Sequence, residues 1–145
     1  MFALFGTPMQ AQGPYWAHAF GGLGPDQLVD VVCDAAGDIY ATGEFSNSFT
    51  FDGQTVVAQG ATDAIVLKVN SSGDLQWMVS AGGADLDRGV SIAVRNGAVA
   101  VTGHYTGTAD LFGTALTSQG GTMDAFVARL DAQTGALLWV RSGGR

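Results

Sequence analysis

The sequence predicts an all-β fold that contains two copies of one antiparallel unit, and three observations lead to this prediction. Trp16, Trp77 and Trp139 lie 61 and 62 residues apart, and the same series of landmarks follows each of them. The segments between landmarks are short, rich in Val, Ile, Phe and Trp, and separated by Gly, Asn, Asp and Ser. No segment shows helical spacing over ten residues with capping residues. The recurring landmarks are Gly21-Gly22, Gly82-Gly83 and Gly143-Gly144; Asp26 and Asp87; Thr42-Gly43 and Thr102-Gly103; Phe51 and Phe112; Asp63 and Asp124; and Gly73 and Gly135.

Each unit contains four predicted strands. A repeat of this length is one supersecondary unit that cannot bury both of its faces alone. Turns with Asn or Asp and Gly connect the strands, because these residues supply side-chain hydrogen bonds to the backbone and positive φ angles. The predicted strands are residues 29–34, 38–42, 63–69 and 74–79 in the first unit, and 90–94, 98–102, 124–130 and 136–141 in the second.

A connection of about 20 residues separates the second and third strands in each unit, residues 44–62 and 104–123. Each connection contains a Phe and, after it, an apolar pair: Val56-Val57 in the first and Ala115-Leu116 in the second. Because a long structureless loop is uncommon in a compact domain, we predict that each connection forms a packed hairpin.

The composition predicts a packed core and argues against some classes of function. Hydrophobic residues make up 47% of the 145 residues and charged residues only 13%, below the roughly 25% usual for soluble domains. The net charge is −7, with six basic residues. This argues against nucleic acid and anionic membranes, which both need patches of Lys and Arg. The charge is interpreted as a source of solubility, and the alternative is that acidic loops hold cations.

Cys33 is the only cysteine, so the sequence encodes no intrachain disulfide and no cluster of thiolate metal ligands. Its place in the run Val31-Val32-Cys33 favours a small buried side chain. No stretch approaches the roughly 18 apolar residues that indicate a membrane span. Residues 1–11 are partly apolar but contain no basic residue, and we do not interpret them as a signal peptide.

Four antiparallel strands per unit, with Gly-Gly at each crossover, are typical of β-propeller blades. A blade has two apolar faces that each need a neighbour, and a Trp near the outer strand fills space where blades splay apart. We expect an N-terminal segment at residues 1–15 and an extra fourth strand at residues 15–21. The predicted organisation is residues 1–15, a first repeat at 16–76, a second repeat at 77–138, and the start of a third repeat or a closing strand at 139–145.

Both units resemble the bacterial β-propeller repeat family that is often described as seven-bladed. Besides the Trp and Gly-Gly landmarks, the resemblance is carried by the runs Asp34 to Gly43, Asp124 to Asp131 and Gly135 to Trp139. It spans residues 16–144. The stretch from Leu130 to Trp139 also resembles the quinoprotein-dehydrogenase blade repeat, although the period here is too long for that repeat. The propeller resemblance implies a binding or spacing module of an exported or surface protein, with no catalytic residues to transfer and no cofactor.

The chain departs from that family in having two blades, whereas propellers close with about four to eight. Two blades alone leave apolar faces and strand edges in water. Either copies assemble into a ring, with a trimer or tetramer favoured, or the sequence is part of a longer chain. Residues 1–15 resemble the end of an earlier blade and are a candidate latch onto a neighbouring chain; chance similarity is the alternative.

The acidic residues near the crossovers form the best polar cluster: Asp26 and Asp30 in the first unit, Asp85 and Asp87 in the second. Asp26, Asp85 and Asp87 are the candidate ligand-binding residues, and the run at 85–87 offers oxygen ligands for Ca²⁺. The alternative is turn capping by bonds to backbone amides. Because Asp26 and Asp87 recur at one repeat position, capping is favoured, and no metal is predicted.

The histidines, His18 and His104, occupy different repeat positions, so a three-ligand zinc site within one chain is hard to build. A ring could place copies of one histidine around its axis, but a solvated position at a blade edge is favoured for His104. No serine-hydrolase, zinc-protease, P-loop or EF-hand pattern is present. Asp26, Asp87 and Glu44 could pair across blades for glycoside hydrolysis, but nothing selects them.

Four aromatic side chains are candidates for a sugar-binding groove, with core packing favoured: Tyr40, Phe45, Tyr105 and Phe126. The leading prediction is a non-enzymatic, homo-oligomeric propeller module for assembly or recognition, extracellular or at a bacterial cell surface. The alternatives are a lectin-like propeller with glycan sites between blades, and an enzyme with a central-channel site. The expected partners are the chain itself and a glycan or protein ligand, with no nucleic acid and no membrane insertion. The landmarks expected to hold the structure are Trp16, Trp77, Trp139, Gly43, Gly103, Asp63 and Asp124.

Overall fold

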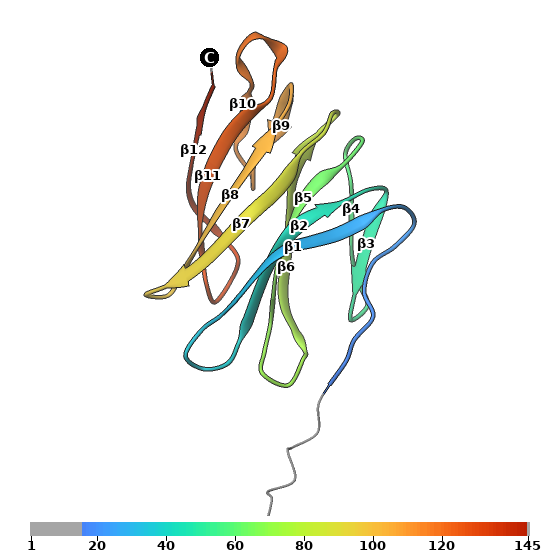
Figure 1. Cartoon of the computed structure of the whole chain (residues 1–145), viewed down its shortest axis with the longest axis vertical. Coiled ribbons are helices and arrows are strands. Elements are labelled where there is room, and N and C mark those ends of the chain that lie inside the picture. Colours follow the sequence, from blue (N-terminus) through green and yellow to red (C-terminus); the bar gives the residue numbers. More distant parts are fainter. Residues whose placement is uncertain (1–15, 145) are drawn as a thin grey trace, which may run out of the picture.

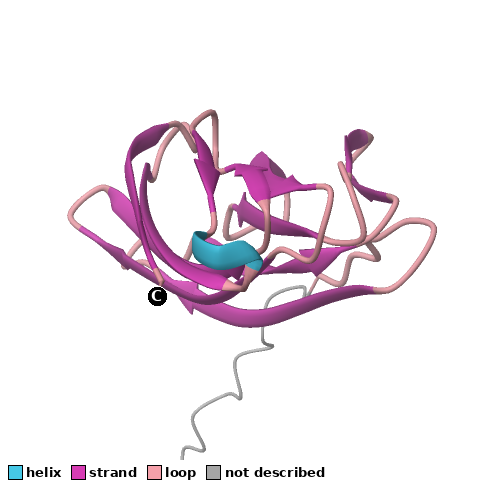
Figure 2. Cartoon of the chain, turned by 90° about the horizontal axis from the view of Figure 1, so that it is seen from above, coloured by secondary structure: helices cyan, strands magenta, loops and turns pink. Residues whose placement is uncertain are grey.

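The computed structural model describes residues 16–144 and is all-β: these residues form twelve strands and one short 3-10 turn (Figure 2). All eight predicted strands are confirmed, and most are longer than expected. The first four are β1 (Asp26–Cys33), β2 (Ile39–Phe45), β5 (Asp63–Val69) and β6 (Leu75–Gly83). The second four are β7 (Arg88–Arg95), β8 (Ala98–Tyr105), β11 (Asp124–Asp131) and β12 (Leu137–Gly143). The remaining elements are β3 (Ser48–Phe51), β4 (Gln54–Val57), β9 (Thr108–Asp110), β10 (Ala115–Thr117) and the 3-10 turn η1 (Gln119–Gly121).

Each unit folds into four antiparallel strands in chain order, β1-β2-β5-β6 and β7-β8-β11-β12 (Figure 1). The registers are equivalent: Ala41 lies opposite Leu67 in the first sheet as Val101 lies opposite Ala128 in the second. In both units the first strand has an irregular register near its middle. The repeat that the sequence predicts is therefore a repeat of strand pairing.

Both long connections form hairpins, β3-β4 and β9-β10, as predicted. One landmark pair is wrong, because Phe112 does not correspond to Phe51. Phe51 and Leu111 are the buried residues at equivalent positions, whereas Phe112 lies in the hairpin turn with φ 57. Sequence matching selected the second Phe, but burial at this position needs only an apolar side chain, and Leu111 supplies it.

The two sheets pack face to face and share one core. The first sheet contributes Tyr40, Val66 and Trp77, and the second sheet covers them with residues that include Val99 and Phe126. A second, smaller core lies on the other face of the first sheet, beneath the β3-β4 hairpin. The first sheet thus has apolar side chains on both faces, as expected of a unit that needs two neighbours.

Trp77 connects the two sheets from β6, the fourth strand of the first unit. Its indole N–H donates to the carbonyl of Ala132, 3.2 Å away in the turn between β11 and β12. Gly135 of that turn has φ 74, and a Cβ at this position would lie 2.8 Å from the Trp77 ring. The turn therefore needs Gly for its backbone conformation and also because the indole lies directly against it.

The turns between paired strands use Asn and Asp as predicted. Asp34 accepts from the amides of Ala36 and Asp38, and Asn70 accepts from those of Ser72 and Asp74. Asp131 plays the same role between β11 and β12. These bonds satisfy backbone groups that the sheets leave unpaired, so the turns are fixed locally.

The structure contradicts the prediction for Cys33 and does not describe the segment at residues 1–15. Cys33 was expected to be buried, but it is exposed at the end of β1, since the first strand has no covering sheet on that side. The proposed latch at residues 1–15 lies outside the described residues. No helix within residues 16–144 is long and apolar enough to cross a membrane.

Replacement of Gly135 by Ala should destabilise the protein more than replacement of Gly113 by Ala. Both glycines have a positive φ, so both variants carry backbone strain of about 1 kcal/mol. Only at Gly135 does the new Cβ also collide with Trp77, which adds about 1–3 kcal/mol of overpacking. Urea unfolding of the two variants at equal protein concentration measures the difference, and equal losses would contradict the role of the Trp77 contact.

Candidate functional site

The acidic residues at the crossovers cap turns. Asp26 accepts from the amide of Gly22 at 2.8 Å, and Asp87 accepts from the amide of Gly83 at 2.6 Å, four residues earlier in both repeats. Asp87 also accepts from the amide of Thr106 at 3.0 Å. These bonds favour the capping interpretation over a calcium site. Within residues 16–144 no group of three His, Cys, Asp or Glu side chains is placed to hold a metal ion.

Asp87 and the landmark Asp63 are fully buried. Burial raises the pKa of Asp87, although its two backbone hydrogen bonds oppose this shift. Burial likewise raises the pKa of Asp63, and the nearby Asp87 carboxylate adds to the effect. The pKa values of both carboxyls are raised because the sheets bury them. Both carboxylates accept backbone hydrogen bonds, so a raised pKa here does not indicate acid–base catalysis.

The other candidates in the acidic cluster are separate from these caps. Asp85 is exposed. Asp30 reaches across to the second sheet, where its carboxylate accepts from the hydroxyl of Ser91 and the amide of Ile92, both at 2.8 Å. Asp30 therefore connects the two first strands, β1 and β7. The sequence placed Asp30 in the right region but gave no signal for this bond.

The histidines are separate, and neither is placed in a metal site. His18 stacks edge-on against Trp16 and Phe51, with ring centroids 5.5 and 5.9 Å away. His104 is half-buried near Arg88, rather than solvated as expected. Burial lowers its pKa, and the Arg88 charge lowers the pKa further.

The four aromatic candidates for a sugar-binding groove are core residues. Tyr40 and Tyr105 are 1% and 0% exposed, and Phe45 and Phe126 are equally covered. The Tyr40 hydroxyl donates to the Asp34 carboxylate at 3.1 Å. Core packing, the favoured alternative, accounts for all four residues.

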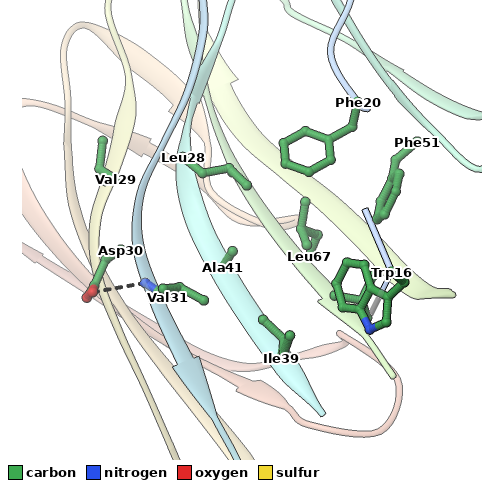
Figure 3. A pocket seen from close by; sticks show the side chains of 11 residues that line it. Trp16, Phe20, Leu28, Val29, Asp30, Val31, Ile39, Ala41, Phe51 and Leu67 are labelled. Atoms are coloured by element: carbon green, nitrogen blue, oxygen red, sulfur yellow. Dashed lines mark hydrogen bonds between the residues drawn. The ribbon is translucent and has the colours of Figure 1, made fainter. Parts of the chain in front are cut away.

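An apolar cavity of about 390 Å³ lies on the outward face of the first sheet (Figure 3). Val31 and Leu28 come from β1, and Ala41 comes from β2. Trp16 and Phe20 form its far wall together with Phe51 of the hairpin (Figure 3). The complete lining is Trp16, Phe20, Leu28, Val29, Asp30, Val31, Ile39, Ala41, Phe51, Leu67 and Val69.

The face of the first sheet that lines the cavity has an equivalent in the second sheet. That equivalent face packs against the first sheet. In the first sheet, Ile39 pairs with Val69 and Ala41 with Leu67. Their counterparts in the second sheet are Val99, paired with Leu130, and Val101, paired with Ala128, and all four are buried in the interface between the sheets. The same surface is therefore covered by a whole sheet in the second repeat, whereas in the first repeat the β3-β4 hairpin and residues 16–21 cover it only in part and leave the cavity. Gly43 and Gly103 lie at equivalent positions beside these pairs, where each closely approaches the backbone of the first strand.

The outer face of the second sheet is open as well. Its counterpart in the first sheet carries Tyr40, Ala64 and Trp77, which are buried against the second sheet. The equivalent residues of the second sheet, Ala100 and Ala125, are exposed. Trp139 is 40% exposed, against 6% for Trp77. The two-sheet stack therefore ends in two complementary surfaces, one partly covered on the first sheet and one open on the second.

The charges are divided unequally between these ends. Residues 16–76 contain eight acidic and one basic side chain, whereas residues 77–145 contain five of each. The free face of the second sheet also carries Arg95 and Arg129 beside Trp139. The whole net charge of −7 thus belongs to the first repeat, a division that the total composition conceals.

Residues 16–21 lie against the first sheet in the same way as β6 lies against the second sheet. The Trp16 indole N–H donates to the carbonyl of Ser71 at 3.1 Å, 55 residues further on, and Trp77 makes the same bond over the same sequence distance. Gly21 pairs with Thr50 of β3, as Gly82 pairs with Asp110 of β9. Residues 16–21 therefore lie where the extra fourth strand was predicted, but they form no strand and make only one isolated bridge, at Gly21.

Comparison of the chain with protein-family models and with curated proteins gives no match.

Replacement of Asp87 by Ala should lower the free energy of unfolding by about 1–3 kcal/mol, because two buried amides lose their acceptor. Replacement of Asp26 should cost less, since Asp26 makes one such bond near the surface. Urea unfolding measures both. Full stability of Asp87→Ala would contradict capping and return Asp87 to the candidate ligand-binding residues.

The contribution of Asp63 and Asp87 to stability should also fall as the pH rises from about 3.8, the ordinary pKa of these carboxyls. A raised pKa in the folded state means that folding favours the protonated acid, so this stabilisation is full below 3.8 and is lost as the pH passes the folded-state pKa. Replacement of Asp63 by Asn should flatten the profile of the urea midpoint above about pH 3.8. Asp85→Asn is the control, and an unchanged profile in Asp63→Asn would contradict the assignment.

Proposed function

We propose that this chain is a non-enzymatic β-propeller module for assembly or recognition, and that its copies join head to tail to complete the propeller. One observation carries the proposal. Each of the two faces that pack together between the sheets has an equivalent at one end of the stack, where no sheet covers it. Apolar sheet faces in water are unfavourable, and a second copy offers the surface that already covers the equivalent face within the chain.

Charge favours head-to-tail over head-to-head contact. A symmetric contact between two first repeats would bring together two units that each contain eight acidic residues and one basic residue. A head-to-tail contact places the acidic repeat against the repeat that carries Arg95, Arg129 and Trp139 on its free face. Like charges at close range cost free energy, so the heterologous arrangement is preferred.

A heterologous contact generates a ring when its rotation closes and a filament when it does not. Each copy supplies two sets of four antiparallel strands, β1-β2-β5-β6, whose sheet the hairpin β9-β10 extends, and β7-β8-β11-β12. Three or four copies would then give six or eight blades, within the range of about four to eight in which propellers close. A discrete trimer or tetramer is therefore the expected species.

A non-enzymatic role is supported by the use of the carboxylates. Asp26 and Asp87 cap turns, and Asp30 connects the two first strands, so these groups have structural partners. The resemblance to repeats of exported proteins extends the proposal to a location at the surface of, or outside, a bacterial cell. The ligand that such an assembly recognises is a glycan or a protein.

The test uses sedimentation velocity of the full chain over a range of concentrations. The unmodified protein should form a discrete trimer or tetramer. Val31→Asp should weaken association by at least about a hundredfold, because it places an unpaired carboxylate in the interface. Val31 is 61% exposed in the single chain, so the substitution should leave its folding intact.

Val57→Asp is the matched control. Val57 is 67% exposed but lies on β4, outside the cavity lining. This variant should associate like the unmodified protein. A monomer at all concentrations in the unmodified protein, or equal effects of the two variants, would contradict the proposed assembly.

A further inference from the structure

Three tryptophans occupy the same position in the repeat. Two of them make the same contact with a turn of the neighbouring sheet. Trp77 donates its indole N–H to the Ala132 carbonyl and lies against Gly135. Trp16 donates to the Ser71 carbonyl at 3.1 Å, and a Cβ on Gly73 would lie 2.6 Å from its ring. Both turns therefore form a receptor of one kind: a carbonyl acceptor and a Gly with positive φ beneath the indole.

The third tryptophan, Trp139, occupies the same place in the repeat but is 40% exposed. It lies on β12, which is paired with β11 from Ala125 to Leu130. A head-to-tail contact would bring the outer strand of one copy to the first sheet of the next, as β6 meets the second sheet within one chain. The receptor that faces Trp139 in that contact is the turn at residues 70–73.

That receptor is already occupied by Trp16 of its own chain. The occupying segment is held weakly: residues 16–21 make the Trp16 bond and a single bridge, between Gly21 and Thr50. Phe20 and His18 add aromatic contacts with Phe51. By contrast, β12 pairs with β11 at six positions. A complete strand, β12, would therefore compete with residues 16–21, which are not part of a sheet.

We propose that residues 16–21 are an intramolecular plug, which Trp139 of a second copy displaces when the chains assemble. The proposal rests on the proposed function and adds its regulation. Trp16 covers the receptor and part of the apolar cavity in the single chain, and Trp139 takes over the bond to the Ser71 carbonyl in the assembly. The plug keeps part of the apolar face of the first sheet covered until a second copy of the correct orientation arrives.

The proposal predicts opposite effects for two equivalent tryptophans. Trp139→Ala removes the entering side chain and should weaken association by at least about a hundredfold, the effect of losing a buried aromatic anchor. Trp16→Ala opens the receptor and should strengthen association by about tenfold if the plug is closed about 90% of the time. Sedimentation velocity of each full-length variant gives both association constants.

Tryptophan fluorescence gives an independent measurement of the same event. In Trp16→Ala, the remaining indoles are Trp77, which is buried, and Trp139, which is exposed. Assembly should therefore shift the emission to shorter wavelength with the concentration dependence that sedimentation reports. Leu138→Ala is the matched control for Trp139, because Leu138 is an adjacent exposed side chain on the same strand, 52% exposed. It should associate like the unmodified protein.

The outcomes separate the plug from the assembly itself. If the unmodified protein assembles and Trp16→Ala assembles equally or more weakly, the plug is disproved while the proposed function stands. If Trp139→Ala assembles normally, the indole contact between copies is disproved. If neither the unmodified protein nor Trp16→Ala associates at any concentration, both the proposed function and the plug are disproved. Urea midpoints of all variants show whether each single chain is folded.

Discussion

The rest of the structure depends on one constraint: each four-stranded sheet has two apolar faces, and a sheet cannot cover its own faces. The first sheet carries Tyr40 and Val66 on one side and Ala41 and Leu67 on the other, and all four are buried. The second sheet covers the first set completely. The hairpin β3-β4 and residues 16–21 cover the other set only in part, and the apolar cavity remains. Stacking in one dimension is the general solution to this problem in repeat proteins, and it creates two ends that remain uncovered.

The tryptophan contact explains why the stack is specific as well as apolar. Burial of sheet faces alone is non-directional and tolerates many relative positions of two sheets. The bond from the Trp77 indole to the Ala132 carbonyl, with the ring against Gly135, fixes one position at the outer edge. The Asp30 carboxylate fixes another position between β1 and β7, through Ser91 and Ile92. Polar bonds at two separated points thus determine the alignment that hydrophobic burial stabilises.

Much of this fold can be predicted from the sequence because the period is visible in residues that few others can replace. Trp16, Trp77 and the turn glycines are such residues, and their positions located the eight strands of the two four-stranded units. Phe112 was misassigned because η1 and the following residues contain one residue more than the first repeat, so an alignment by residue type chose the wrong neighbour of Leu111. Exposure of Cys33 could not be predicted, because it depends on which neighbour a sheet lacks and not on the local pattern. The capping role of Asp87 followed from its recurrence, whereas its complete burial required the fold.

The described residues contain more segments for the fourth-strand position than the sheets need. Residues 16–21 and β12 of a second copy would therefore compete for the same place on the first sheet. The described residues supply the first three strands of a sheet twice, but the fourth-strand position three times: at residues 16–21, in β6 and in β12. Every stack built from copies of these residues therefore has one surplus fourth strand at each junction. Two segments cannot place an indole against Gly73 at once, so one must leave. Because β12 is already part of a sheet and residues 16–21 are not, the ladder of hydrogen bonds decides which segment stays. The same reasoning holds whichever chain supplies the neighbouring sheet, since it depends only on the geometry of the turn at residues 70–73.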